Sequence, residues 1–261
     1  MNNKQQTIFS FYGFILMLLS VTACAEKSPE QKAAQNTNSI PVTIYSGMQL
    51  GSLLNEVVAS DKVDDVKVMF NKDWYSAVNV KSAKQTNETY SIKSCAEYFK
   101  LADKSLTTVK ENENSAFAEF VLMCQVAKVI VEAKPSKLTF LNDLTFDKNL
   151  PDKLPKQIAM VISSTESKKI NENSNLVNWS DVNKITKVDV ISEFKAIYHQ
   201  QGSTQEIELV AKGDFNADGI EDVLLSSRDS VEGGSYGALR MLYFTKQSNE
   251  GAYVMGKEFS Y

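Results

Sequence analysis

Residues 213–222 read Gly-Asp-Phe-Asn-Ala-Asp-Gly-Ile-Glu-Asp, and three apolar residues follow at 223–225. Short polar side chains at alternate positions let a tightly curled loop direct several oxygen atoms inward, and Gly219 permits the sharp backbone turn. The apolar run after the loop indicates a β-strand, so the loop is expected to join two strands of a hairpin. This hairpin decides the fold class of the C-terminal part of the chain.

The same residues predict a calcium site. Ca²⁺ takes roughly six to eight oxygen ligands at about 2.3–2.6 Å. The expected ligands are the side chains of Asp214, Asn216, Asp218 and Asp222 and the backbone carbonyl of Ile220. Three carboxylates packed together without a cation would repel one another and raise a pKa. An EF-hand is excluded, because its twelfth position requires glutamate and is Leu225 here, within a strand rather than a helix.

The run Ala211–Phe244 resembles an FG-GAP (integrin-type) or VCBS repeat. The matching features are the 213–222 motif, the strand after it, Gly233-Gly234 and the returning strand 237–244. The resemblance implies calcium held between two strands of a hairpin. The chain has one copy of the unit, so neither a propeller nor an integrin-like ligand surface is implied. The expected ion is structural, and the alternative is an acidic turn that no longer binds one.

The residues after Val188 have a β pattern of short apolar runs divided by turn residues. The predicted strands are Val188–Tyr198, Ile207–Ala211, Val223–Ser226, Leu239–Thr245 and Tyr253–Phe259. Residues 40–175 are predicted to be mainly helical and residues 176–261 to be β-rich. A helical front and an antiparallel sheet that carries the calcium-loop hairpin give an α+β fold.

Apolar residues at helical spacing mark three helices in residues 40–175. One stripe is formed by Leu50, Leu53, Leu54, Val57 and Val58, and the other helices cover Cys95–Val109 and Phe117–Val131. The polar residues 110–115 predict the turn of an αα-hairpin. Residues 66–70 and 77–80 are compatible with strands, and residues 168–180 are predicted to form an exposed loop.

The first 23 residues have the organisation of a signal peptide. A polar start containing Lys4 precedes about 12 mostly apolar residues, Ile8–Leu19, too few to cross a hydrocarbon core of ~30 Å. The sequence Val-Thr-Ala-Cys at 21–24 then resembles the lipobox of bacterial lipoproteins, which implies cleavage before Cys24 and lipidation of its thiol. A signal peptide without lipid is the alternative. By resemblance to enterobacterial sorting, Ala25 favours the outer membrane, facing the periplasm, with the cell surface as a second location.

Residues 24–39 are expected to be the lipidated cysteine and a polar tether that reaches about 20 Å on average. Removing 23 of the 261 residues leaves 238, enough for one large domain or two small ones. The mature chain has 27 Lys and Arg against 32 Asp and Glu, a net charge of about −5. No basic patch is interleaved with aromatic residues, so nucleic acid is not an expected partner.

The two remaining cysteines, Cys95 and Cys124, predict a disulfide in an oxidising compartment, with two buried free thiols as the alternative. In a straight helical hairpin the two positions are offset by about 9 Å. A disulfide allows roughly 4.4–6.8 Å between Cα atoms. The bond therefore requires the first helix to begin after Cys95 or the two helices to cross at an angle.

The inventory of catalytic residues favours a protein without enzyme activity. His199 is the single histidine, so the common zinc sites and most hydrolase triads are excluded. The nucleophile-elbow, P-loop and Rossmann glycine patterns are absent from the sequence. Trp74, Tyr75 and Trp179 could line a binding surface, but core packing is the preferred interpretation.

These observations predict a lipid-anchored, calcium-binding periplasmic protein that binds another protein. One version is an inhibitor or immunity lipoprotein that neutralises a toxin or lytic enzyme acting in the periplasm. The alternatives are an envelope enzyme that acts on glycan or lipid through acidic residues and an accessory of envelope assembly.

Overall fold

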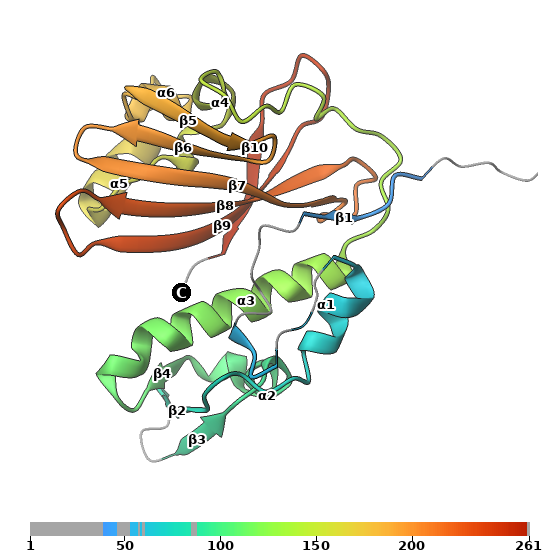
Figure 1. Ribbon diagram of the computed structural model, residues 1–261, viewed down its shortest axis with the longest axis vertical. Coiled ribbons are helices and arrows are strands. Elements are labelled where there is room, and N and C mark those ends of the chain that lie inside the picture. Colours follow the sequence, from blue (N-terminus) through green and yellow to red (C-terminus); the bar gives the residue numbers. More distant parts are fainter. Residues whose placement is uncertain (1–38, 46–52, 57, 59–60, 85–87, 260–261) are drawn as a thin grey trace, which may run out of the picture. The chain divides into compact units, whose positions relative to one another are not determined.

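Seven antiparallel strands form the larger sheet in the computed structural model, which describes residues 39–45, 53–56, 58, 61–84 and 88–259 (Figure 1). Six strands lie in the order β10-β9-β8-β7-β6-β5, and β1 pairs with the end of β7. Their bounds are β1 Thr43–Ile44, β5 Lys187–Ser192, β6 Lys195–Gln200, β7 Ser203–Gly213, β8 Asp222–Val231, β9 Gly237–Thr245 and β10 Val254–Phe259. The α+β fold class and the antiparallel C-terminal sheet are confirmed. The run predicted as one strand over 188–198 is instead the hairpin of β5 and β6.

The larger sheet separates two hydrophobic cores. Successive side chains of a strand point to opposite faces, and in β8 the side chain of Leu224 lies in one core while those of Val223 and Leu225 lie in the other. All three are fully buried. Burial on both faces explains why β8 begins with a continuous apolar run instead of an alternating pattern.

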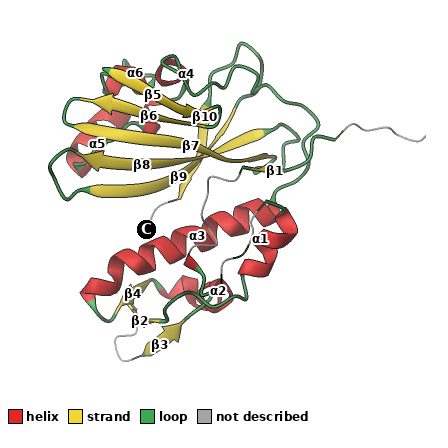
Figure 2. Cartoon of the chain, viewed as in Figure 1, coloured by secondary structure: helices red, strands yellow, loops and turns green. Residues whose placement is uncertain are grey.

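The first core packs on helices and a small sheet from the N-terminal part of the chain (Figure 2). The elements are α1 Val63–Met69, β2 Val78–Ser82, β3 Thr89–Ile92, α2 Cys95–Leu101, η2 Ala102–Lys104, β4 Leu106–Thr108, η3 Glu111–Glu113 and α3 Asn114–Glu132. The three strands pair in the order β3-β2-β4. The prediction of a mainly helical region therefore missed a three-stranded sheet.

Helix α3 is the central helix of this part. Residues 111–132 are long and apolar enough to cross a membrane by length and composition. Nine side chains of α3 are buried, among them Phe117, Phe120 and Ile130, and the helix contacts β9 and β10. Burial of this kind is expected for the core helix of a folded domain.

The predicted αα-hairpin is wrong in its first helix. α2 ends at Leu101, and Ser105 has a left-handed φ of 53°, which breaks the helical geometry. The next residues form β4, in which Thr108 lies opposite Val80 of β2. Strand pairing with β2 has overridden the helical spacing of the apolar residues in this stretch.

The short first helix also changes the geometry around the cysteines. Cys95 is the first residue of α2 and Cys124 lies in the middle of α3. Their side chains form a disulfide, with Cα atoms 5.3 Å apart. The offset calculated for a straight hairpin does not apply, because the chain between the two helices contains a strand and two 3₁₀ turns.

Three other predicted elements differ from the structure. Residues 66–70 belong mostly to α1 rather than to a strand, whereas residues 77–80 overlap β2. Of the predicted stripe at 50–58, Leu50 and Val57 lie outside the described residues, and Leu54 forms a β-bridge with Trp74. The predicted exposed loop at 168–180 is non-helical at residues 173–178, but its first five residues belong to a helix, whose first turn Ser163 caps by accepting a hydrogen bond from the amide of Glu166.

The second core lies between the other sheet face and the segment that follows α3. Its elements are α4 Leu150–Lys153, η4 Lys156–Ile158, α5 Ser164–Glu172 and α6 Trp179–Val182. Leu150, Ile158 and Trp179 pack against strand residues such as Tyr198 and Phe244. The two cores thus cover the two faces of the sheet, and the 214–221 loop leaves it between β7 and β8.

Candidate functional site

The loop of residues 214–221 joins the paired ends of β7 and β8. Asp214 and Asp222, at its base, have 4% and 0% of their surface exposed. Asn216 and Asp218, at its tip, are exposed. The loop therefore places two of the four predicted side-chain ligands inside the protein and two at the surface.

Hydrogen bonds from backbone amides hold the loop in a curled conformation. The carboxylate of Asp214 accepts from the amides of Asp218 at 3.0 Å and Gly219 at 2.8 Å. Oδ1 of Asn216 accepts from the amide of Asp218 at 2.9 Å, and Oδ1 of Asp218 accepts from the amide of Ile220 at 2.8 Å. Gly219 has a φ of 85°, a conformation that glycine adopts without strain. The alternating side chains therefore direct their oxygen atoms toward the loop's own backbone.

Asp222 has the least favourable environment for a charged carboxylate in this loop. Its Oδ2 accepts from the amide of Phe215 at 2.9 Å, but its buried Oδ1 accepts no hydrogen bond of ordinary geometry. Burial raises the pKa of Asp222 to about 6, and the charges of Asp218 and Asp214 act in the same direction. A buried oxygen without a donor is costly. The position therefore favours either a proton or a cation.

The donor set of the loop fits a hard cation. Across the described residues, no three His, Cys, Asp or Glu side chains converge as a ready metal-binding group. In the loop, Asp214 and Asp218 accept hydrogen bonds from backbone amides. An oxygen-only donor set and the unpartnered Oδ1 of Asp222 nevertheless suit Ca²⁺. A carboxylate has about four lone-pair sites, so Asp214 and Asp218 can bind an ion while they keep these hydrogen bonds.

A segment distant in sequence, residues 134–139, lies against the loop. Lys134 and Asp214 exchange two backbone hydrogen bonds of 3.0 Å. Two amides of the segment donate to the carbonyl of Gly219 at 2.7 and 3.2 Å, and the amide of Glu221 donates back to the segment at 2.8 Å. About 80 residues separate the two partners, so no local sequence pattern predicts this contact. The loop is therefore part of a junction and not an isolated turn.

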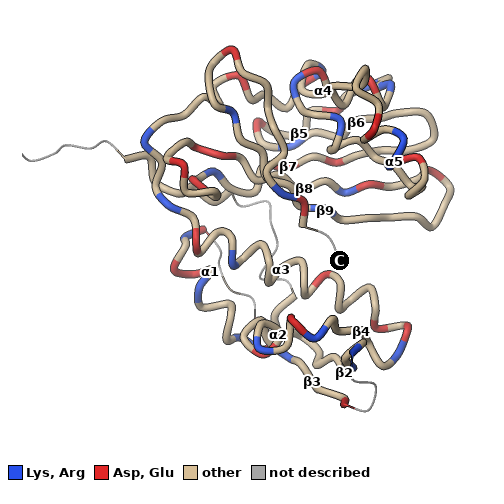
Figure 3. Tube along the Cα trace, turned by 180° about the vertical axis from the view of Figure 1, so that it is seen from behind, with Lys and Arg blue, Asp and Glu red and all other residues tan. Residues whose placement is uncertain are grey.

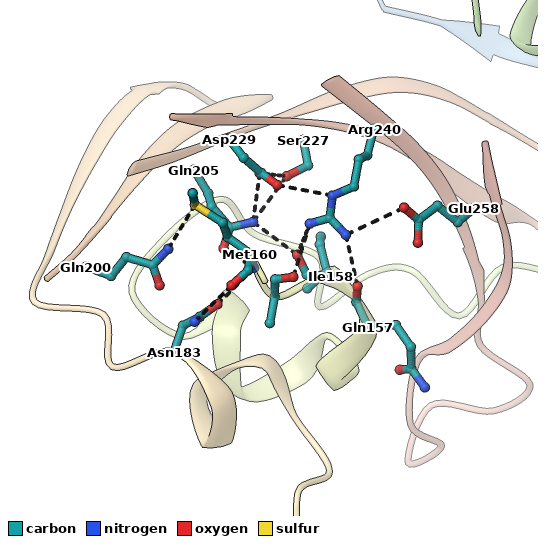
Figure 4. Close-up of polar contacts among 11 residues, drawn as sticks. Gln157, Ile158, Met160, Asn183, Gln200, Gln205, Ser227, Asp229, Arg240 and Glu258 are labelled. Carbon is teal, nitrogen blue, oxygen red and sulfur yellow. Dashed lines mark hydrogen bonds and ion pairs between the residues drawn. The ribbon is translucent and has the colours of Figure 1, made fainter. Parts of the chain in front are cut away.

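A second polar site lies on the face of the larger sheet that packs on η4 (Figure 4). The polar cluster, as we call it, comprises Gln205 of β7, Ser227 and Asp229 of β8, Arg240 of β9 and Glu258 of β10. Oδ1 of Asp229 accepts from Ser227 at 2.7 Å and from Gln205 at 3.1 Å, and its Oδ2 accepts from Nε of Arg240 at 3.1 Å. No sequence motif predicted this cluster. The available signal was a set of polar residues in the second half of β8, after its apolar run.

Arg240 forms four hydrogen bonds within the protein. Besides the aspartate, its guanidinium donates to the carbonyls of Gln157 at 3.2 Å, Ile158 at 2.6 Å and Ala159 at 3.3 Å, and Glu258 lies 3.7 Å away. Four of the five N–H groups of the arginine are thus hydrogen-bonded within the protein, and Glu258 is an ion-pair partner. A cavity of about 220 Å³ borders the cluster, but most of the donors of the arginine are already used. The cluster therefore holds η4 against the sheet.

The other residues singled out from the sequence have structural environments. Nε2 of His199 lies 2.8 Å from Oδ2 of Asp189 on the neighbouring strand. Trp74 and Trp179 are buried, with 3% and 0% of their surface exposed. Tyr75 is 53% exposed and is the one of the three aromatic residues that is available at the surface.

Cys24 lies outside the residues that the structure describes. No protein-family model, curated protein or solved structure matches the chain. The indications of function therefore come from the chain itself.

Proposed function

We propose that the chain is a lipid-anchored, calcium-binding protein of the bacterial envelope that acts by binding another protein. The observation that carries the calcium proposal is the carboxylate of Asp222, which is fully buried in an acidic loop and whose Oδ1 accepts no hydrogen bond of ordinary geometry. The hydroxyl of Thr245 is a further polar neighbour of this group and lowers its pKa, but burial outweighs that effect. Ca²⁺ would neutralise this group, with Asp214, Asn216, Asp218 and the carbonyl of Ile220 as the remaining ligands. The expected role of the ion is structural.

A non-enzymatic role is supported by the state of the best-formed polar site. Catalysis requires a group whose hydrogen-bonding capacity is available to a substrate. In the polar cluster, Arg240, Asp229 and Gln205 are bonded to one another or to backbone carbonyls of η4. Lysine, arginine and acidic residues are interspersed along the described chain (Figure 3), which gives no support to a nucleic-acid partner.

A protein partner is supported by the outer edge of the larger sheet. β5 is the last strand on that side and, among the described strands, pairs with β6. Val190 and Ile191 are consecutive residues of β5 with 60% and 56% of their surface exposed. A cavity of about 400 Å³ beside them is lined by Val190, Leu144, Phe146 and Phe194, among others. An open edge with apolar side chains is suited to accept an extended strand from another chain.

If the chain is an inhibitor or immunity protein, its partner is a toxin or lytic enzyme that acts in the periplasm. A lipid at Cys24 would hold the protein at the membrane where such an attack occurs. Mass spectrometry of the protein from its native envelope is expected to find a mature chain that begins at Cys24 and carries fatty acids. A chain that still begins at Met1 would contradict the anchor and the location.

The partner proposal is tested by affinity capture with residues 25–261 as bait. Wild-type bait should retain one partner in stoichiometric amount from an envelope extract, and Ile191→Lys should lose it, because a charge on the edge opposes strand addition. Val177→Lys is the matched control, since Val177 is 58% exposed and belongs to no strand. Equal capture by wild type and Ile191→Lys would exclude the β5 edge. Turnover of peptidoglycan or phospholipid by the purified protein would favour the enzyme alternative.

A further inference from the structure

The described chain begins beside the segment that contacts the acidic loop. Ile40 and Ser136 exchange two backbone hydrogen bonds of 2.8 and 2.9 Å. Cys24 precedes Ser39 by 15 residues, a length that reaches about 20 Å on average. If Cys24 carries the lipid, Ser39 and Ile40 are the described residues closest to it along the chain, and Ile40 is bonded to Ser136.

The edge of the domain around Ser136 carries side chains suited to a membrane surface. Lys134 and Lys137 are exposed, and in the described part of the chain neither ammonium group lies within ion-pair distance of a carboxylate oxygen. Leu138 has 55% of its surface exposed. Backbone hydrogen bonds to the loop hold all three residues in place. The exposed lysines are suited to bind anionic lipid headgroups, and the exposed apolar side chain beside them is suited to enter the acyl layer below.

The tip of the acidic loop belongs to the same edge. Asn216, Ala217 and Asp218 are exposed, and the Cδ atom of Lys137 would lie 3.8 Å from a Cβ atom placed on Gly219. Five loop residues supply five oxygens if each gives one, whereas Ca²⁺ takes roughly six to eight. Water or an outside oxygen must supply the rest. A lipid phosphate can supply such an oxygen ligand, and its negative charge is attracted by both the ion and the lysines.

We propose that this loop edge, defined as Lys134, Lys137, Leu138 and residues 216–218, contacts the phosphate groups of an anionic bilayer when calcium is bound. The inference rests on the proposed calcium site. Without the ion, the carboxylates of the loop repel phosphate. With the ion, the charge of the three ligand carboxylates falls from −3 to −1, and Lys134 and Lys137 then make the charge of the edge positive.

Vesicle binding by residues 25–261 tests this proposal, because the compact unit of residues 37–261 is retained whole and the lipid is absent. The vesicles contain either phosphatidylglycerol with phosphatidylethanolamine or phosphatidylcholine alone, each with calcium or with EGTA. We expect binding to the anionic vesicles in calcium and at least a tenfold loss in EGTA. The double variant Lys134→Gln/Lys137→Gln should bind roughly 25-fold more weakly, about fivefold for each lysine.

Two controls separate the possible failures. Lys168→Gln/Lys169→Gln removes two exposed lysines of α5, and an equal loss there would overturn the proposal in favour of unspecific attraction. Calcium binding is measured separately by calorimetry: calcium binding without vesicle binding overturns the lipid contact alone, and no calcium binding overturns the proposed calcium site and this inference with it. Calcium-dependent binding of glycerol phosphate, without vesicle binding, would identify a soluble phosphate as the ligand and overturn the membrane contact.

Discussion

Replacing Asp222 by asparagine should stabilise the calcium-free protein and abolish its response to calcium. Asparagine keeps an oxygen that can accept from the amide of Phe215, as Oδ2 of Asp222 does at 2.9 Å. It also replaces a fully buried charge by a neutral amide next to the carboxylates of Asp214 and Asp218. The variant therefore removes the electrostatic cost of the calcium-free loop, and it also removes one ligand of the calcium-bound loop.

The magnitude follows from the pKa of Asp222. Burial raises this pKa to about 6 from an ordinary value of 3.8, so folding favours the protonated form. Stability is then lost as pH rises from about 4 to about 6 and stays low above that range. The charged carboxylate costs about 3 kcal/mol at pH 7 and about 1 kcal/mol at pH 4.5. The difference of about 2 kcal/mol corresponds to a shift of roughly 4–8 °C in melting temperature for a domain of this size.

The assay is thermal unfolding in EDTA and in calcium at several pH values. In EDTA at pH 7, Asp222→Asn should melt above the wild type, and the gap should narrow toward pH 4.5. In calcium at about 100 times its Kd, the wild type should gain about 2.7 kcal/mol and the variant nothing. Glu221→Gln is the matched control, because Glu221 is 7% exposed, bonds to the hydroxyl of Thr139 and is not a predicted ligand.

Two outcomes would refute this reasoning. Identical melting of wild type and Asp222→Asn in EDTA at every pH would show that the buried carboxylate carries no cost. A full calcium response in Asp222→Asn would show that this carboxylate is not a ligand. Loss of the response in Glu221→Gln as well would assign the effect to general damage at the base of the loop.

Two further predictions concern the rest of the fold. Arg240→Met should lower the free energy of unfolding, measured in urea, by about 3–5 kcal/mol, because Asp229, 2% exposed, keeps its charge without a counter-ion. Glu258→Gln should cost less than about 1 kcal/mol, since Glu258 lies 3.7 Å from Arg240 and is partly exposed. Equal costs of the two substitutions would contradict this prediction. Thiol labelling of the unfolded, unreduced protein should find no free thiol at Cys95 or Cys124, and two labelled thiols would exclude the disulfide. Replacing both cysteines by serine should lower the free energy of unfolding by about 3–4 kcal/mol, because the disulfide closes a loop of 29 residues.

The parts of the fold that the sequence predicted are those with a local signal. The acidic loop is defined by spacing within nine residues, and the strands around it by apolar runs between turn residues. The continuous apolar start of β8 predicted a strand, and its burial on both faces explains that pattern. The sequence predicts helix α3 because its apolar stripe is much longer than the error of a few residues in the predicted ends of a helix.

The parts that were missed depend on contacts distant in sequence. The stretch Leu106–Thr108 has helical spacing, but it becomes β4 because β2 offers a partner strand. The polar cluster assembles from four strands and bonds to carbonyls of η4, and the contact of Arg240 with Ile158 joins residues 82 positions apart. Single residues such as Gln205 carry no local sign of such a role. In β4 and in the polar cluster, contacts with distant parts of the chain determine the structure, and local secondary-structure propensity does not.

The position of the acidic loop explains why one turn can affect the stability of the whole domain. β1 pairs with the end of β7 directly before the loop, residues 134–139 bond to the loop backbone, and Gln247 donates to Oδ2 of Asp218 at 2.9 Å. These segments come from distant parts of the chain, so closing them on one point restricts many intervening residues. An ion that rigidifies the loop would act on all three contacts together. Removal of calcium is therefore expected to lower the global melting temperature, and not only to loosen the tip at residues 216–218.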